Sequence, residues 1–123
     1  MASNTVAGQH YEKLARDYLL QQGLSLLEQN YHSRFGEIDL IMIDRKTLCF
    51  IEVKFRKTNA FGGAASAIPR AKQKKIIKTA QCYISAKPAM AQKPMRFDAL
   101  IMQLESSLTD ITMEWIQNAF YVE

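Results

Sequence analysis

The sequence predicts an α/β sandwich in which helices pack against one central mixed sheet. Three features indicate it: a helical pattern near the amino terminus, a pair of strongly apolar strand-like segments, and a second helical pattern followed by one or two strands. Helices and strands in this order pack as layers around a common core. The chain has 123 residues and no repeat, low-complexity tract or linker, so we expect one domain over residues 1–123.

The first helix is expected from about Asn4 to Gln22. Asn4 and Thr5 carry side-chain oxygens suited to capping its amino terminus. Apolar side chains recur at the spacing of one buried helix face, namely Tyr11, Leu14, Ala15, Tyr18 and Leu19. Gly23 follows at the position where a left-handed backbone commonly ends a helix. Residues 24–31 then form a plausible first strand.

Two further strands are expected at residues 36–43 and 48–55, joined by a tight connection over residues 44–47. Together they predict an antiparallel hairpin. A four-residue turn pairs Ile43 with Leu48 and sets Asp39 opposite Glu52. Because side chains alternate between the two faces of a strand, Glu52 shares its face with Lys54. The other face is apolar: Ile38, Leu40 and Met42 against Cys49, Ile51, Val53 and Phe55.

A second helix is expected from Pro69, which suits a first helical turn, to about Ser85. Its buried arc is predicted to contain Ile76, Ile77, Ala80, Tyr83 and Ile84. Lys74, Lys75 and Lys78 fall on the opposite side. Residues 59–65 and 87–94 are expected to be loops. Residues 97–104 and 111–120 are expected to be strands, although the last segment is also compatible with a helix.

Composition limits the cellular compartments and the classes of partner that we expect for this protein. The chain is 48% hydrophobic, but no stretch approaches the roughly 20 apolar residues that span a bilayer. Because the amino terminus lacks the pattern of a secretory signal, a cytoplasmic protein without a membrane partner is expected. Cys49 and Cys82 have apolar neighbours and are expected to be buried, inert thiols. The net charge of +4 permits nucleic-acid binding without establishing it.

The predicted opposition of Asp39 and Glu52 is the chemically informative feature. Two carboxylates opposed on a partly buried strand pair repel each other, and burial disfavours their charged forms. Either one carboxyl holds a proton, or a divalent cation lies between the two. Mg²⁺ prefers oxygen ligands and takes one or two carboxylates with waters and phosphate oxygens. Asp39 and Glu52 fit that role, together with the backbone carbonyl of Val53.

Lys54 would add an ammonium on the same face. Such a group can orient an attacking water and stabilise charge that builds on a phosphate. A metal-dependent phosphodiesterase site follows from this reading. The alternative is that Glu52 and Lys54 belong to an ordinary solvated strand face. The apolar segments around them, such as Phe50-Ile51, favour a functional role for these charges, because buried charges without a role are rare.

Several segments resemble a known family: Gly36-Glu-Ile-Asp-Leu-Ile41, Phe50-Ile-Glu-Val-Lys54 with Arg56, and Arg96-Phe-Asp98. They are similar to the signature of the YraN-like family of small bacterial proteins. These are predicted endonucleases of the PD-(D/E)xK superfamily, distantly similar to archaeal Holliday-junction resolvases. The resemblance implies a restriction-endonuclease-like three-layer sandwich. It also implies that Asp39, Glu52 and Lys54 hold and use Mg²⁺ or Mn²⁺.

The resemblance and the positions of single residues along the predicted elements suggest supporting residues. The match at Gly8, Glu12 and Ala15 suggests that Glu12 completes the metal site; a solvated helix-edge glutamate is the alternative. Arg34, Arg56, Lys72 and Gln73 are candidates for contacts with nucleic acid, although Arg34 and Lys72 also suit solvated positions. Asp98 is expected to pair structurally with Arg96 or another cation and is left out of the catalytic set.

The functional expectation is a metal-dependent endonuclease that acts on DNA rather than RNA, including branched or repair intermediates. A second hypothesis keeps the fold for nucleic-acid binding or an adaptor role without catalysis. A third is a partner-binding domain in which residues 111–120 form a homodimer surface, and this does not exclude the first.

Overall fold

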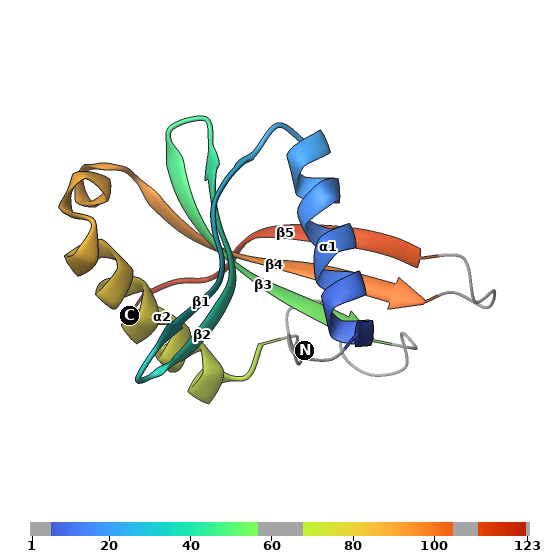
Figure 1. Ribbon diagram of the computed structural model, residues 1–123. Coiled ribbons are helices and arrows are strands. Elements are labelled where there is room, and N and C mark those ends of the chain that lie inside the picture. Colours follow the sequence, from blue (N-terminus) through green and yellow to red (C-terminus); the bar gives the residue numbers. More distant parts are fainter. Residues whose placement is uncertain (1–5, 57–67, 105–110, 123) are drawn as a thin grey trace.

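Figure 1 shows the computed structural model, which describes residues 6–56, 68–104 and 111–122. The elements are α1 (Val6–Gln21), β1 (Ser25–Ser33), β2 (Gly36–Asp44), β3 (Thr47–Arg56), α2 (Arg70–Ala86), the 3-10 helix η2 (Pro88–Gln92), β4 (Met95–Leu104) and β5 (Ile111–Phe120). The strands form one five-stranded sheet in chain order. Neighbouring strands are antiparallel except for β3 and β4, which are parallel. The predicted mixed sheet is therefore confirmed.

One helix packs on each face of the sheet. Ala15 and Leu19 of α1 lie in a buried cluster with Leu40, Ile51 and other side chains of β2, β3 and β4. Ile76, Ala80 and Tyr83 of α2 lie in a second buried cluster, with Ile41, Phe50, Phe97 and Ile101 among its members. This three-layer arrangement agrees with the restriction-endonuclease-like sandwich that the resemblance implies. Within the described residues, no helix is long and apolar enough to cross a membrane.

The β2–β3 hairpin has the predicted register. Ile43 faces Leu48, and Asp44 faces Thr47 across a two-residue turn. Arg45 in this turn has a φ of 60°, the left-handed conformation that tight hairpin turns demand. The two strands pair only as far as Leu40 and Ile51, so Asp39 and Glu52 lie just past the last pair.

Beyond that point the sheet divides. β2 continues beside β1, while β3 continues beside β4 through Arg56. Figure 1 shows β1 and β2 turning towards α2 as β3, β4 and β5 run the other way. Ile38 packs in the cluster under α2, although alternation predicted that it would share a face with Leu40. Strand alternation describes the paired part of the hairpin but not the part that leaves its partner.

Other predictions are corrected at the ends of elements. Pro69 takes the N-cap position of α2 and not its first turn. Residues 88–92, predicted as loop, form η2, with Pro88 inside its first turn. The last segment is a strand and not a helix. Gly23 has the predicted left-handed backbone, with a φ of 101°. The proposed caps at Asn4 and Thr5, and the loop at residues 59–65, lie outside the described residues.

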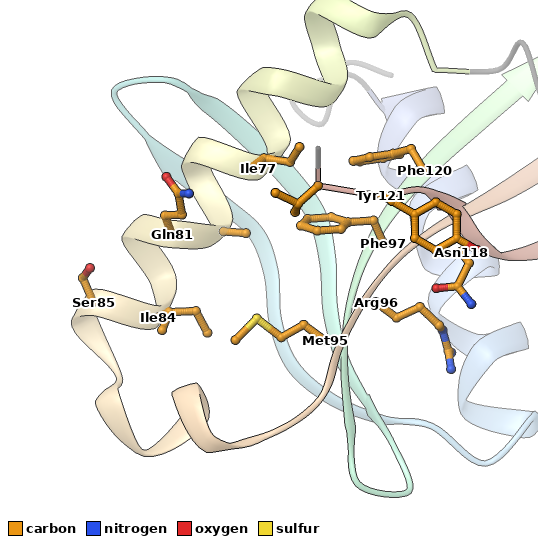
Figure 2. A pocket seen from close by; sticks show the side chains of 12 residues that line it. Ile77, Gln81, Ile84, Ser85, Met95, Arg96, Phe97, Asn118, Phe120 and Tyr121 are labelled. Atoms are coloured by element: carbon orange, nitrogen blue, oxygen red, sulfur yellow. The ribbon is translucent and has the colours of Figure 1, made fainter.

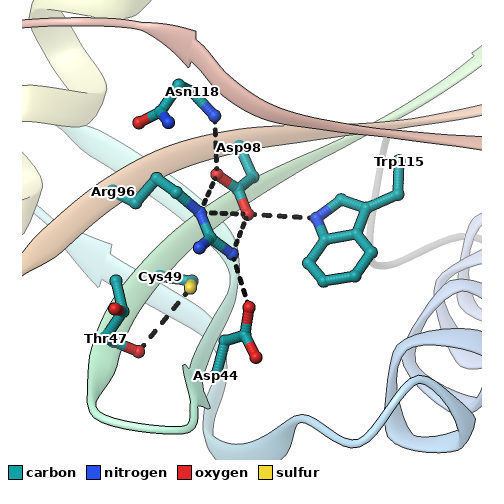
Figure 3. A network of polar contacts seen from close by, with 7 residues as sticks. All are labelled: Asp44, Thr47, Cys49, Arg96, Asp98, Trp115 and Asn118. Atoms are coloured by element: carbon teal, nitrogen blue, oxygen red, sulfur yellow. Dashed lines mark hydrogen bonds and ion pairs between the residues drawn. The ribbon is translucent and has the colours of Figure 1, made fainter.

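A buried ionic cluster joins β4 to β5 and to the β2–β3 turn (Figure 3). The carboxylate of Asp98 is fully buried and accepts hydrogen bonds from Arg96 Nε at 2.9 Å, from Trp115 Nε1 at 3.0 Å and from the Asn118 backbone N–H at 3.1 Å. Arg96 also donates to Asp44 Oδ2 at 3.1 Å. The predicted structural pairing of Asp98 with Arg96 is thus confirmed.

Both cysteines are free thiols. Cys49 is buried, as predicted, and burial with the nearby charge of Asp98 raises its pKa to about 12. Such a thiol is protonated and unreactive at neutral pH. Cys82 is only half-buried, because it lies at the edge of the α2 face that packs on the sheet.

Candidate functional site

A cleft of about 360 Å³ opens where β2 leaves β3 and the first turns of α2 approach. Its lining consists of Gly36, Glu37, Asp39, Glu52, Pro69, Ala71, Lys72, Lys75 and Ile76. The divergence of the two strands explains the cleft, because a continuous ladder would leave no opening beside the carboxylates. Asp39 and Glu52, which the sequence singles out, therefore lie in the same cleft.

The two carboxylates are held close together with little access to water. Each residue is 5% exposed, and Asp39 Oδ2 accepts a hydrogen bond from the Val53 backbone N–H at 2.8 Å. Burial raises the pKa of Asp39 well above its usual range, and the charge of Glu52 and a hydrogen bond to it raise the pKa further. Burial beside a like charge therefore favours the protonated form of Asp39 in the metal-free protein.

Glu12 of α1 does not line the cleft, but its charge interacts with those of Glu37 and Glu52. It is 2% exposed, and its Oε1 has no hydrogen-bond partner among the described residues. Burial raises its pKa, as do the charges of Glu37 and, to a smaller extent, Glu52. The Asn30 amide, with its nitrogen turned towards the carboxylates, donates to Glu12 Oε2 at 2.9 Å and to Glu37 Oε1 at 3.2 Å.

Sequence reasoning did not find Asn30. Its φ of 54° lies in the left-handed region, which asparagine adopts more readily than most residues. That conformation within β1 is the one signal available, and it requires a structure to be seen. Asn30 thus donates hydrogen bonds to both Glu12 and Glu37, and the sequence alone does not predict this contact.

Among the described residues, the lysine that forms an ion pair with the cleft carboxylates is Lys72 and not Lys54. The Lys72 ammonium forms an ion pair with Glu52 Oε2. Burial lowers the pKa of Lys72, but the hydrogen bond and charge of Glu52 outweigh this and raise it. Lys54 is exposed and does not line the cleft. It shares a strand face with Glu52, as predicted, but it lies where β3 has already lost β2 as a neighbour.

The other predicted contacts lie at different distances from the cleft. Gln73 donates from Nε2 to the Ile68 carbonyl at 2.9 Å, so it closes the turn before α2 and does not line the cleft. Arg34 is exposed in the β1–β2 turn. Arg56 is half-buried, and its Nε has no partner among the described residues. Lys75, which was assigned to the far side of α2, lines the cleft.

Known proteins are similar in sequence to this chain over most of its length. Residues 11–102 match the model of the uncharacterised protein family UPF0102. The chain belongs to the UPF0102 family. The UPF0102 protein of Alcanivorax borkumensis is 42% identical over 123 residues, covering 100% of this chain and 98% of the relative. That of Psychromonas ingrahamii is 51% identical over 110 residues, covering 89% and 84%. The YraN-like resemblance is confirmed at this family level.

The family match covers the candidate site of this UPF0102 chain, since Asp39, Glu52 and Lys72 of the cleft and Glu12 near it all lie between residues 11 and 102. Among the described residues, no three His, Cys, Asp or Glu side chains are grouped as a ready metal cage. Mg²⁺ does not need such a cage, because waters and phosphate oxygens complete its shell. Asp39, Glu52 and the unpartnered oxygen of Glu12 supply oxygen donors that suit a hard cation.

A larger hollow of about 550 Å³ lies on the other side of α2 (Figure 2). Ile77 and Ile84 of α2 face Met95 and Phe97 of β4 across it. Its lining is mainly apolar and contains no carboxylate and none of the predicted site residues. Volume alone therefore does not identify the candidate site of this UPF0102 protein, which is the smaller, charged cleft.

The raised pKa of Asp39, about 9, predicts a pH effect on metal-free protein. Between the unfolded pKa near 4 and the folded value, the native state binds a proton that the unfolded chain has released. The free energy of unfolding should therefore fall as pH rises through this window, by at most about 1.4 kcal/mol per pH unit. Urea unfolding in EDTA at several pH values measures it. Asp39→Asn should flatten the slope, and an unchanged slope would contradict the assignment.

Proposed function

We propose that this chain is a divalent-metal-dependent nuclease that hydrolyses phosphodiester bonds of DNA. The supporting observation is the pairing of Asp39 and Glu52, both nearly buried, in a cleft whose opposite wall carries lysines. Opposed buried carboxylates are costly for a fold and repay that cost where they hold a cation. The lysines of α2 provide positive charge where a phosphate would enter.

The chain's own residues then have distinct roles. Asp39 and Glu52 hold Mg²⁺ or Mn²⁺, the Val53 carbonyl is a further ligand, and Glu12 assists from α1. The Val53 N–H keeps the Asp39 carboxylate oriented. The bound cation would supply Lewis-acid stabilisation of charge on the phosphate. The Lys72 ammonium, which pairs with Glu52, would bind the substrate phosphate or orient the attacking water.

The substrate is proposed to be DNA, including branched or repair intermediates, because the YraN-like resemblance favours it. Arg34, Arg56 and the exposed lysines of α2 would hold the phosphate backbone. The second hypothesis, a nucleic-acid-binding adaptor without catalysis, uses the same basic residues. It gives no reason for two nearly buried carboxylates, Asp39 and Glu52, to share a cleft with Lys72, so catalysis is the better-supported proposal.

A cleavage assay separates the two hypotheses. End-labelled blunt duplex, single-stranded, flapped and four-way-junction DNA would each be incubated with protein in Mg²⁺, Mn²⁺ or EDTA. The nuclease proposal predicts metal-dependent products from at least one substrate and none in EDTA. Salt-sensitive binding without turnover in either metal would contradict it and support the adaptor.

The sequence predicts that Lys54 contributes more to cleavage than Lys72, whereas the structure predicts the opposite order. Lys72→Ala should reduce kcat for cleavage by about 100-fold, because it removes the ammonium nearest the carboxylates. Lys54→Ala should cost less than about tenfold, as expected for an exposed backbone contact. Single-turnover kinetics at saturating DNA measure both. The reverse order would restore Lys54 as the water-positioning residue and leave Lys72 as a structural partner of Glu52.

A further inference from the structure

We propose that the β1–β2 turn and the adjoining side of α2 form a subsite for an unpaired nucleotide of DNA, with Phe35 as the surface on which its base stacks. This subsite lies next to the carboxylate cleft, and its role in substrate selection rests on the proposed nuclease function. It specifies the substrate class: DNA with an unpaired nucleotide beside the bond that is cut.

Phe35 is flanked by two cations. The guanidinium of Arg34 lies 4.8 Å from the ring centroid, and the ammonium of Lys78 lies 5.3 Å from it. The ring is half-buried, and both cationic residues are exposed. Phe35 directly precedes Gly36, which lines the cleft. An aromatic ring with cations beside it combines the two elements that bind single-stranded nucleic acid, namely a stacking surface and charge for the phosphates.

Partly buried hydrogen bonds hold this turn against α2. The hydroxyls of Ser33 and Thr79 lie 2.8 Å apart, and Thr79 is completely buried. The Phe35 backbone N–H donates to Ser33 Oγ at 3.0 Å. The turn therefore has a fixed position on the helix, and Phe35 faces Lys78 without the ordering cost that a free loop would incur on binding.

A row of lysines connects the ring to the carboxylates. Lys72, Lys75 and Lys78 recur every three residues and so lie along one side of α2. The first pairs with Glu52, the second lines the cleft with its Cβ close to Gly36, and the third lies over Phe35. The row extends about 9 Å along the helix axis, which corresponds to roughly two or three nucleotides.

The charge of α2 selects a polyanion. The helix contains five basic residues and no Asp or Glu: Arg70, Lys72, Lys74, Lys75 and Lys78 carry its charges. A blunt duplex could bind these lysines through its phosphates, but the bases within it are stacked on one another and have no free face for Phe35. An unpaired base can reach the ring. It displaces one of the two cations from the ring face, and that cation then stays beside the phosphates. The ring beside the lysine row thus favours a strand with an unpaired base.

Binding in EDTA tests the subsite without catalysis. Fluorescence anisotropy would compare fluorescently labelled blunt duplex with the same duplex carrying a short single-stranded tail. Phe35→Leu keeps an apolar side chain but removes the aromatic face, so affinity for tailed DNA should fall about tenfold. Affinity for blunt duplex should change less than twofold. Phe35→Tyr should retain tailed-DNA binding, and Lys46→Ala, an exposed lysine in the β2–β3 turn, is the matched control for charge.

Salt dependence adds an independent readout. Lys78→Ala should lower the slope of log affinity against log salt by about 0.7 on tailed DNA, as expected for one phosphate contact on a single strand. The subsite would be overturned if Phe35→Leu lost affinity equally for tailed and blunt DNA. It would also be overturned if Phe35→Leu had the Tm of wild type and lost no affinity for tailed DNA.

Failure of the subsite differs from failure of the nuclease proposal. Cleavage of tailed DNA that Phe35→Leu leaves unchanged removes the subsite and keeps the nuclease. Tail-selective binding without cleavage in any metal keeps the binding surface and removes the nuclease, and with it the role in substrate selection.

Discussion

Asp39→Asn is expected to abolish metal-dependent cleavage, with a loss of at least about 100-fold in rate. Asparagine preserves the shape of the side chain, and its amide oxygen can still accept from the Val53 N–H. It cannot bind a cation as a carboxylate does. In EDTA the variant should be at least as stable as wild type, because the buried acidic group opposite Glu52 has been removed. Single-turnover cleavage and urea unfolding measure the two effects.

The combination of lost activity and retained stability distinguishes a metal ligand from a structural residue. Glu52→Gln should also lose cleavage, although it disrupts the ion pair with Lys72 as well. Glu114→Gln is the matched control, because Glu114 is an exposed carboxylate on β5 and should leave both measurements unchanged. Cleavage by Asp39→Asn at the wild-type rate would remove Asp39 from the site.

The largest effect on stability is expected at Asp98. Asp98→Ala leaves Arg96, whose side chain is only 12% exposed, without its principal carboxylate and leaves the indole N–H of Trp115 unpaired. Removing one partner of a buried ion pair typically costs about 3–5 kcal/mol. The free energy of unfolding from urea titration should fall by about that amount.

A matched variant shows whether burial causes this loss. Asp44 also binds Arg96, but its side chain is 22% exposed and can be replaced by water. Asp44→Ala should therefore cost much less, about 1 kcal/mol. A loss for Asp98→Ala as small as that for Asp44→Ala would mean that water solvates the Arg96 charge when Asp98 is removed.

The paired part of the sheet was predictable from sequence. Alternation along residues 36–43 and 48–55, with a short polar connection, fixed the pairing of Ile43 with Leu48 that the structure has. Apolar spacing in the two helices correctly placed Leu19 and Tyr83 in the core. These features depend on local periodicity, which a single sequence records directly.

The arrangement around the carboxylates was only partly predictable. Alternation placed Asp39 beside Glu52 but could not show that the strands part there, since that depends on the partners β1 and β4. For the same reason Lys54 was expected in the site and is found exposed.

Two predictions for side chains of α2 depended on surroundings that periodicity does not describe. The face of a helix opposite its core can still border a cleft, as Lys75 does. Gln73 was expected to contact substrate, but its amide satisfies a backbone carbonyl before the helix. Helix periodicity gives the direction of a side chain, whereas its partner depends on how the turn before the helix is built.

A titration of Mn²⁺ against thermal stability tests the central claim most directly, because it needs no knowledge of the substrate. Binding to the native cleft should raise Tm with metal concentration, by an amount equivalent to about 2.7 kcal/mol at 100 times Kd. Asp39→Asn should abolish this shift, Glu12→Gln should weaken it, and Glu114→Gln should preserve it. If wild type and Asp39→Asn gain the same stability, or neither gains any, the carboxylate cleft is not a metal site.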